Sequence, residues 1–434
     1  MNASAEAVPG SHRAHLAPVS APEVVVREGM LDVPGEVSLY HGGRLSGIRI
    51  AWRLAGPANA PVVCALGGIS ANRRVFVTEE EAHGSSESRR GWWAEIVGPG
   101  RALDANRFRV LSFDYLGGSA ETTGPTSTSS GSTGSAPTTV ALTAYAQSAL
   151  ERPSARDAAT DTTPGPRSAN DSAAATTGTD ADSCTTAGSA TSRSARQSHE
   201  QARQTNGQAF PTISTYDQAE LLVRLLNNLG LKSLRAIIGG SYGGMVALAF
   251  GERYPERVSQ LIVIGAADRT HPMATAWRSV QRQILRFSID CGRPKEGLKL
   301  ARALAMSTYR SAEEFEARFD GVPVRDGERY VFPVEQYIFA RGNDFADKHS
   351  AEAVLCLSES IDLHRVEAAR IFVPTTIVAV REDQLVPLAD LRGLAARLPA
   401  ARLHEISSIY GHDAFLKESD QLRGIFAAAL GGAA

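Results

Sequence analysis

The sequence predicts an α/β fold with a mostly parallel sheet flanked by helices. Short apolar runs alternate with stretches of helical periodicity, which is typical of parallel strands joined by crossover helices. One apolar run ends in a glycine-rich turn around Ser241 that leads into a helical stretch, and two later runs are followed closely by Asp383 and by His412. Functional side chains of such sheets gather at the carboxyl ends of the strands, so we expect these three residues to meet.

The first elements of the core follow a segment that looks unstructured. Residues 1–30 are expected to form a flexible arm, and residues 31–125 the first part of the core. Residues 37–54 are predicted as a pair of strands around a His-Gly-Gly turn, and residues 61–66 and 107–113 as two further strands.

A change of composition then interrupts the core. Residues 126–207 consist mostly of Ser, Thr, Ala and Gly and contain few large apolar side chains. Such a stretch buries too little surface to offset its ordering entropy, so we predict a disordered insertion in a surface loop. A binding or tethering segment is the alternative interpretation.

The core resumes over residues 208–271 with a regular order of elements. Residues 215–229 have helical periodicity and end at a glycine, and residues 234–238 form the apolar run before Ser241. Residues 245–254 predict the helix after that turn, and residues 258–264 the next strand.

A helical cap is predicted between two strands of the sheet. Residues 272–366 are mostly helical in pattern, most clearly over 274–287 and 296–306. The last part of the core then covers residues 367–434.

The turn Gly239-Gly240-Ser241-Tyr242-Gly243-Gly244 is the most informative motif. A Gly-x-Ser-x-Gly between a strand and a helix holds its serine in a sharp turn, with the hydroxyl exposed at the edge of the sheet. The motif alone is common, because Gly and Ser are common residues. In this context Ser241 is a candidate nucleophile.

A serine nucleophile needs a base and an orienting carboxylate, and both have candidates downstream. The buried strand predicted over 372–380 is followed by Asp383, with Glu382 as the local alternative. A short strand over 402–406 precedes the loop that carries His412. Serine, acid and histidine follow in the chain order of α/β-hydrolases, and their joint occurrence predicts a catalytic triad.

Two backbone N–H groups are expected to form an oxyanion hole. One is that of Tyr242, which follows the nucleophile, and the other is that of Gly68 in the loop after the strand at 61–66. The alternative for this loop is that its glycines only turn the chain.

Composition excludes several classes of function. The formal net charge of −2 gives no reason to expect nucleic acid or an anionic membrane as partner, and no apolar run is long enough to span a bilayer. The N-terminus lacks the basic and apolar segments of a secretory signal. The widely spaced Cys64, Cys184, Cys291 and Cys356 are expected to be free thiols in a reducing compartment. The ten histidines show no metal-binding spacing, so no metal or cofactor is expected.

Several local stretches together resemble the homoserine O-acyltransferases of methionine biosynthesis. They include Trp92-Trp93 with the following Gly-Pro-Gly, the Leu-Gly-Gly and Thr-Thr-Gly-Pro segments of 116–125, and Phe210-Pro211. Ser-Tyr-Gly-Gly-Met at 241–245, Gly-Leu…Ala-Arg…Thr-Tyr-Arg-Ser over 297–311 and Gly-His-Asp-Ala-Phe-Leu at 411–416 complete the likeness.

The resemblance implies a role for each matching residue. Ser241, Asp383 and His412 match the nucleophile, acid and base of an α/β-hydrolase fold, and Arg310 and Asp413 match the residues that bind the carboxylate and ammonium of the amino acid. The substrates implied are homoserine and an acyl-CoA, and a cytoplasmic homodimer is implied as well.

Five residues near the predicted acyl site depart from the family pattern. Tyr242 stands for Met, Val246 for Gln, Gly67 for Thr, and Asp114-Tyr115 for a stretch that contains Asn. They leave the acyl donor open between acetyl-CoA and succinyl-CoA. Serine as acceptor, an esterase or thioesterase that uses water, and a non-catalytic binding protein are the alternatives.

Overall fold

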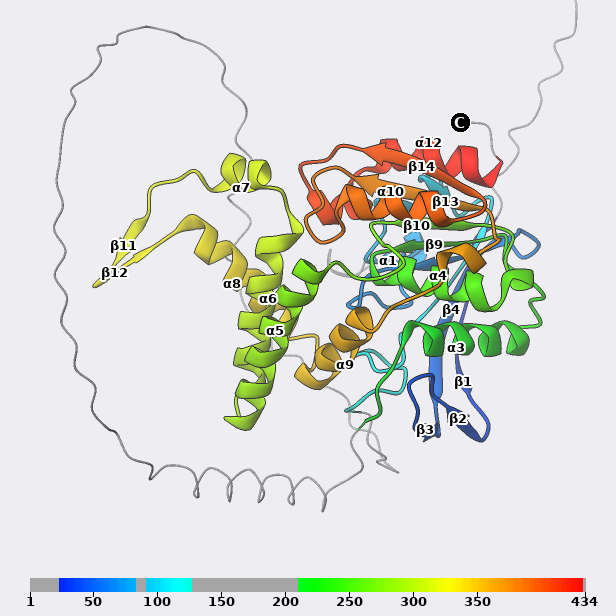
Figure 1. The fold of residues 1–434 in the computed structure, drawn as a ribbon, viewed down its shortest axis with the longest axis horizontal. Coiled ribbons are helices and arrows are strands. Elements are labelled where there is room, and N and C mark those ends of the chain that lie inside the picture. Colours follow the sequence, from blue (N-terminus) through cyan, green and yellow to red (C-terminus); the bar gives the residue numbers. More distant parts are fainter. Residues whose placement is uncertain (1–22, 83–90, 127–209, 432–434) are drawn as a thin grey trace, which may run out of the picture. The chain divides into compact units, whose positions relative to one another are not determined.

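The fold is described from a computed structural model that covers residues 23–82, 91–126 and 210–431. Its centre is an eight-stranded sheet with the order β1-β4-β8-β5-β9-β10-β13-β14 (Figure 1). The strands in this order are β1 (Val25–Asp32), β4 (Arg49–Gly56), β8 (Arg109–Phe113), β5 (Val62–Leu66), β9 (Ala236–Gly240), β10 (Leu261–Ile264), β13 (Thr375–Val380) and β14 (Ala401–Ile406). The pairs β1–β4 and β4–β8 are antiparallel and all others are parallel, so the predicted mostly parallel sheet is confirmed.

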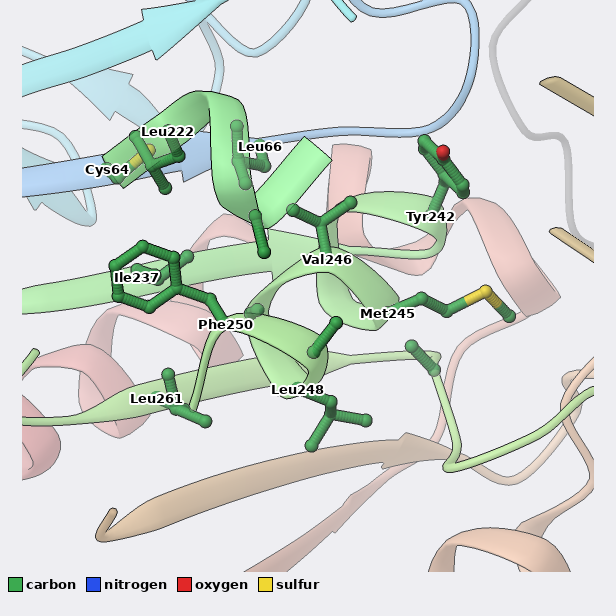
Figure 2. Packing of buried hydrophobic residues seen from close by; sticks show 14 of the residues in the cluster. Cys64, Leu66, Leu222, Ile237, Tyr242, Met245, Val246, Leu248, Phe250 and Leu261 are labelled. Atoms are coloured by element: carbon green, nitrogen blue, oxygen red, sulfur yellow. The ribbon is translucent and has the colours of Figure 1, made fainter. Parts of the chain in front are cut away.

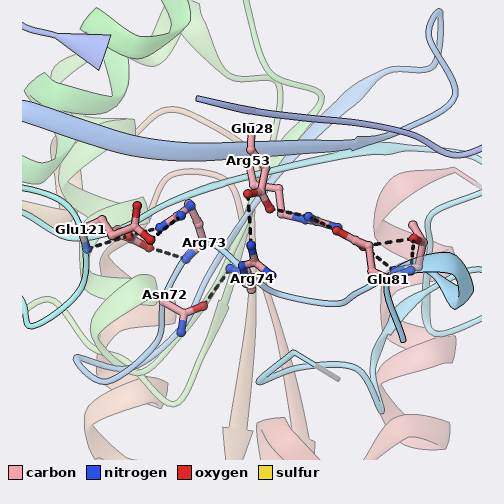
Figure 3. A network of polar contacts seen from close by, with 9 residues as sticks. Glu28, Arg53, Asn72, Arg73, Arg74, Glu81 and Glu121 are labelled. Atoms are coloured by element: carbon pink, nitrogen blue, oxygen red, sulfur yellow. Dashed lines mark hydrogen bonds and ion pairs between the residues drawn. The ribbon is translucent and has the colours of Figure 1, made fainter. Parts of the chain in front are cut away.

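The prediction of a flexible arm over residues 1–30 is wrong for its last part. Val25–Asp32 pairs along its whole length with β4 and forms the edge of the sheet. Glu28 in this strand forms an ion pair with the buried Arg53 of β4, which Figure 3 shows together with Glu81. The strand was missed because its apolar residues come in adjacent pairs, Val25-Val26 and Met30-Leu31, and so give no alternating pattern. Residues 1–22 lie outside the described residues.

Two short pairs of strands in the first part of the chain lie outside the central sheet, one before β4 in the sequence and one after β5. β2 (Glu36–Ser38) and β3 (Arg44–Ser46) form a hairpin around the predicted His-Gly-Gly turn, and β4 follows directly. β6 (Val97–Gly98) and β7 (Leu103–Asp104) pair in parallel near the second tryptophan of the Trp-Trp motif. The predicted insertion at 126–207 lies outside the described residues except for its first residue.

Alternate residues of the central strands enter two separate cores. In β5, Cys64 and Leu66 join one core while Val63 and Ala65 join the other, as expected for a strand buried on both faces. The first core contains α3 (Thr215–Asn228), α4 (Tyr242–Arg253) and α10 (Leu388–Arg397), and the second contains α12 (Ser419–Leu430). Figure 2 shows the buried side chains of α4 packed on the neighbouring strands.

The helices of the first core have clear local signals. Ser214 caps α3 by accepting a hydrogen bond from the Asp217 N–H, and the Asp217 carboxylate accepts one from the Ser214 N–H, which completes a capping box. The helix predicted over 245–254 begins three residues earlier than predicted, at Tyr242, because the serine turn leads into it without a break.

The segment between β10 and β13 contains the predicted helices and one element that was not predicted. Its helices are α5 (Pro272–Asp290), α6 (Pro294–Tyr309), α7 (Ala312–Phe319), α8 (Pro333–Ala346) and α9 (Ala351–Asp362). The helices α5, α6, α8 and α9 share a small apolar cluster that includes Leu285 and Leu298. A hairpin of β11 (Val324–Asp326) and β12 (Arg329–Val331) lies between α7 and α8 (Figure 1). Its three-residue strands are too short to give a periodic signal.

Candidate active site

Ser241 occupies the sharp turn between β9 and α4. Its φ of 54° makes it the one residue other than glycine with positive φ in the described part of the chain. The Ser241 N–H donates to the carbonyl of Ile264 on the neighbouring strand, while its own carbonyl accepts from Gly244 and Met245 in the first turn of α4. A strained backbone held by bonds on both sides is the expected setting of an elbow nucleophile.

The glycines of the motif are required by close backbone contacts. A Cβ atom on Gly239 would lie 2.2 Å from the carbonyl oxygen of Gly243, and one on Gly243 would lie 2.4 Å from the carbonyl oxygen of Leu66. Both distances are far below van der Waals contact, so the strand and the helix approach this closely only without side chains at these positions.

The structure brings the three predicted triad residues together. His412 Nε2 lies 2.9 Å from Ser241 Oγ, and His412 Nδ1 lies 2.7 Å from Asp383 Oδ2. The other oxygen of Asp383 accepts hydrogen bonds from the backbone N–H groups of Leu385 and Val386, which fixes the carboxylate in a buried position. The geometry matches the nucleophile, base and orienting acid of a Ser-His-Asp site.

The alternative acid, Glu382, has a different place. Its carboxylate accepts hydrogen bonds from the Ser407 hydroxyl and from the Ser408 N–H, and no bond joins it to His412. The structure therefore selects Asp383.

The electrostatics of His412 suit a general base that is held by its acid. Burial lowers the pKa of the imidazole, but the charge and hydrogen bond of Asp383 outweigh this, and the pKa is raised from its ordinary value. Asp413 adds to the increase, whereas the positive charge of Arg278 opposes it. The protonated imidazole that forms when the serine is deprotonated is thereby stabilised.

The predicted oxyanion donors flank the serine. The N–H of Tyr242 belongs to the first residue of α4, where helical N–H groups are free to bind an anion. Gly68 lines the same cavity as Ser241, and no atom lies within 4 Å of a Cβ built on it. Gly68 is thus at the cavity wall, and the Tyr242 N–H directly follows the nucleophile, although the Tyr242 side chain is buried away from the cavity.

Two hydrogen bonds to the Gly67 carbonyl fix the peptide group that carries the Gly68 N–H. The carbonyl oxygen of Gly67 accepts hydrogen bonds from the Gly243 N–H at 2.9 Å and from the Tyr115 hydroxyl at 2.8 Å. A peptide unit is planar and its C=O and N–H point in opposite directions, so fixing the Gly67 oxygen also fixes the direction of the Gly68 N–H. Tyr115 was not predicted to contribute to the site.

Asp114 anchors the same loop further along. Its carboxylate accepts bonds from the backbone N–H and from the guanidinium of Arg73, both at 2.6 Å, and Arg73 also binds Glu121 (Figure 3). Burial raises the pKa of Asp114 although Arg73 opposes this. The Asp114-Tyr115 pair, noted as a departure from the family pattern, therefore holds both ends of the loop after β5.

Tyr242 completes this support with its side chain. Its ring meets that of Tyr115 edge to face at 5.0 Å, and its hydroxyl bonds to Ser360 Oγ at 2.7 Å on α9. Figure 2 shows the side chain at the start of α4, apart from the aliphatic residues around Phe250. The residue thus links the serine turn to the helices inserted after β10.

A cavity of about 200 Å³ opens over Ser241 and His412. Residues from the core loops and from α5, α6, α8 and α9 line it. Its charged lining is strongly biased in sign among the described residues, with Asp413 as the one carboxylate and with four arginines: Arg269, Arg278, Arg282 and Arg302. Such a cavity favours anionic groups on its ligands.

The prediction that Arg310 contacts the substrate is not supported by its position. Arg310 is absent from the cavity lining, and its guanidinium binds Asp413 at 2.8 Å and Glu314 at 3.0 Å. The reason is that α6 ends at Tyr309, so the following residue leaves the helix in an extended conformation and turns away from the cavity. Asp413 does line the cavity, and Arg310 holds its carboxylate in place.

Two residues of the same motif were missed by the sequence analysis. Arg302 and Tyr309 both line the cavity from one face of α6, seven residues apart. The guanidinium of Arg302 lies 5.1 Å from the centre of the Tyr309 ring and 4.6 Å from that of Phe345. Within the described ranges it has no carboxylate partner. The sequence did contain a signal for them, because the arginine and the tyrosine of the motif are two helical turns apart and so lie on one face of a helix.

Other expectations concern groups away from the cavity. Cys64, Cys291 and Cys356 are free cysteines, and Cys184 lies outside the described residues. In the ranges that the structure describes, no group of three or more candidate ligands could hold a metal ion. Over the same ranges, every helix is too short or too polar to cross a membrane.

Comparisons with known proteins show similarity over most of the chain. A family model described as alpha/beta hydrolase fold matches residues 82–419. The homoserine O-succinyltransferase of Xanthomonas campestris pv. campestris is 32% identical over 412 residues, which cover 94% of this chain and 85% of the relative. The homoserine O-acetyltransferase of Thermus thermophilus is 32% identical over 355 residues, or 79% of this chain and 72% of the relative.

A solved structure shows the same fold. The crystal structure of homoserine O-acetyltransferase from Bacillus anthracis superimposes with a TM-score of 0.69 at 17% identity, and the match covers 94% of this chain and 98% of that one.

Proposed function

Because the chain belongs to the homoserine O-acyltransferases of the α/β-hydrolase fold family, we propose that it transfers an acyl group from an acyl-CoA to the γ-hydroxyl of homoserine. One observation of the site carries the proposal. A hydrogen-bonded Ser-His-Asp triad lies in a cavity that also presents Arg302, a guanidinium without a carboxylate partner among the described residues. A hydrolase needs the triad alone, whereas a transferase to an amino acid also needs a cation for the acceptor's carboxylate.

The first step forms an acyl-enzyme. His412 Nε2 accepts the proton of Ser241 Oγ, and the oxygen attacks the thioester carbonyl carbon. The backbone N–H groups of Tyr242 and Gly68 bind the oxyanion, a contribution of about 2.7–4 kcal/mol for each such donor. The carbon–sulfur bond then breaks, and His412 returns the proton to the sulfur, so that CoA leaves as a thiol.

The second step repeats this chemistry with homoserine in place of serine. The γ-hydroxyl of homoserine gives its proton to His412 and attacks the acyl carbon. The bond from the acyl carbon to Ser241 Oγ breaks, and the serine oxygen regains the proton. Free enzyme and O-acylhomoserine result, and the kinetics are ping-pong.

Two groups of the cavity hold the acceptor. The guanidinium of Arg302 binds the carboxylate of homoserine with paired hydrogen bonds, and the Asp413 carboxylate binds its ammonium. Arg310 keeps Asp413 in position through the bond at 2.8 Å. Holding the hydroxyl at the acyl carbon gives it a high effective concentration relative to water.

The test is a thiol-release assay on the purified full chain. Acetyl-CoA or succinyl-CoA is supplied with homoserine, with serine or with no amino acid, and Ser241→Ala serves as control. Release that depends on homoserine and disappears in the variant supports the proposal. Equal release without an amino acid means that water is the acceptor and that the protein is an esterase or thioesterase. A preference for serine identifies a serine O-acyltransferase.

Arg302 has its own test. Arg302→Gln removes the charge at similar size, and we expect the KM for homoserine to rise about 10- to 100-fold, as for the loss of a charge-assisted hydrogen bond. An unchanged KM would overturn its role as the acceptor's anchor.

We also propose a homodimer that acts in the cytoplasm. An apolar stripe along α5 supports the dimer, because Met273, Val280 and Phe287 recur every seven residues and are 52%, 53% and 73% exposed. The free cysteines of the described ranges suit a reducing compartment. Light scattering of the wild type and of Phe287→Glu tests the dimer, which is wrong if the wild type has the mass of one chain.

A further inference from the structure

The part of the cavity wall formed by α5 contains a second cationic group. Arg278 and Arg282 of α5 both bind Asp362, which ends α9. The three side chains are nearly buried, with 13%, 11% and 10% exposure. Two guanidinium groups share one carboxylate, so the cluster retains one excess positive charge.

The two arginines differ in how much of their hydrogen-bonding capacity the protein uses. Arg282 is enclosed, because it also donates to the carbonyl and hydroxyl oxygens of Ser358 and to the hydroxyl of Ser279. Arg278 donates to Asp362 from Nε and Nη2 only, and among the described residues nothing accepts from its Nη1. Arg278 lines the cavity, so this unused donor is available to a ligand there.

An uncompensated positive charge in a nearly buried wall is costly unless the ligand supplies an anion. Homoserine has one carboxylate, and Arg302 on α6 is the separate cation for it. Arg269, the remaining arginine of the lining, is exposed to solvent, so its charge does not require an anion from the ligand. Among the less exposed cations, the cavity therefore has one more than the acceptor needs. The other ligand of the cavity is the acyl group on Ser241, and an acetyl group carries no charge.

We infer that the acyl group transferred by this enzyme ends in a carboxylate, as succinyl does, and that Arg278 binds that carboxylate. The inference rests on the proposed acyl transfer at the same site. A succinyl chain extends three carbon–carbon bonds of about 1.5 Å each from the thioester carbon, and so reaches roughly 4 Å from it. Ser241 and Arg278 line one cavity of about 200 Å³, which suits a donor of this length. Acetyl would leave Nη1 of Arg278 without a partner.

The variant Arg278→Gln isolates this role. It removes the excess charge but leaves Arg282 and Asp362 as a balanced buried pair, so the fold is expected to persist. Arg286→Gln is the matched control, because Arg286 lies on the same helix, is exposed and does not line the cavity.

The experiment measures kcat/KM for succinyl-CoA and for acetyl-CoA at saturating homoserine, and separately the KM for homoserine, in the wild type and both variants. We expect the wild type to prefer succinyl-CoA. In Arg278→Gln the value for succinyl-CoA falls about 10- to 100-fold, as expected for one charge-assisted hydrogen bond, while that for acetyl-CoA changes less than about threefold. Arg286→Gln behaves as the wild type.

Three outcomes overturn the inference. A wild type that prefers acetyl-CoA refutes it while leaving acyl transfer to homoserine intact. An equal loss with both donors shows that Arg278 is structural. A rise confined to the KM for homoserine assigns the acceptor, not the donor, to Arg278. If neither donor acylates homoserine, the proposed function itself fails, and this result is distinct from the other three.

Discussion

Replacing Tyr115 by Phe tests whether the hydrogen bond from Tyr115 to the Gly67 carbonyl positions the Gly68 N–H for the oxyanion. The change removes the hydroxyl that donates to the Gly67 carbonyl at 2.8 Å and keeps the ring that packs on Tyr242. The Gly67 oxygen retains the hydrogen bond from the Gly243 N–H at 2.9 Å. The peptide group between Gly67 and Gly68 therefore loses one of its two anchoring bonds and keeps the other. Tyr115 does not contact the reacting atoms, and its effect acts entirely through the direction of the Gly68 N–H.

The expected loss of transition-state stabilisation lies between the value of one anchoring hydrogen bond and that of a whole oxyanion donor. Losing a whole oxyanion donor costs about 2.7–4 kcal/mol of transition-state stabilisation, which is the upper limit. One net hydrogen bond of the anchoring kind is worth about 1 kcal/mol, and a factor of ten in rate corresponds to about 1.4 kcal/mol. We therefore expect kcat to fall about 5- to 20-fold, with both KM values within about twofold of the wild type.

Steady-state kinetics with both substrates measure this change. The same variant should lose affinity for a tetrahedral phosphonate mimic in proportion to kcat/KM, because only the transition state uses the oxyanion hole. Tyr254→Phe is the control, since it removes a hydroxyl that bonds to Glu220 at the outer side of α4. Unchanged kcat in Tyr115→Phe, or an effect on KM alone, would refute the anchoring argument.

Three further predictions concern the triad and its turn. Asp383→Asn should lower kcat by about 10⁴-fold with little change in either KM, since the histidine loses the acceptor that fixes its tautomer; single-turnover acylation measures this. Activity should rise with pH through a midpoint above the ordinary histidine value, because His412 must be neutral to accept a proton and its pKa is raised; a pH profile of kcat/KM with a midpoint below that value contradicts it. Gly239→Ala should destabilise the fold by about 3 kcal/mol or more, because its Cβ would meet backbone at 2.2 Å; denaturant unfolding with an unshifted midpoint would disprove this.

The triad could be predicted because each member has a local signal. Ser241 lies in a glycine pattern that only a tight strand-to-helix turn requires, Asp383 follows the buried strand β13, and His412 follows the edge strand β14. The carboxyl ends of parallel strands meet at one edge, so chain order was enough to place them together.

The acceptor's anchor could not be predicted in the same way. Arg302 and Arg310 belong to one motif, and the choice between them depends on which points into the cavity. That depends on the end of α6 at Tyr309 and on the capture of Arg310 by Asp413, a residue 103 positions away in sequence. Neither fact has a local signal. The edge strand β1 was missed for a related reason, because its partner strand, not its own composition, orders it.

Three of the departures from the family pattern, Gly67, Tyr115 and Tyr242, form one connected group behind the oxyanion hole. Tyr115 bonds to the carbonyl of Gly67 and packs against Tyr242. A side chain at position 67 would meet the Trp92 ring at 2.5 Å, so Gly67 and this placement of Trp92 require each other.

Substitutions that contact one another in this way are not independent. Restoring the family residue at Tyr242 alone would remove both the ring contact with Tyr115 and the bond to Ser360, and would leave a buried gap. Double-mutant cycles between Tyr115 and Tyr242 should therefore give a coupling energy of about 0.5–3 kcal/mol in stability. Additive effects would mean that the two tyrosines contribute separately, and that Tyr242 does not help to hold the loop of the oxyanion donor.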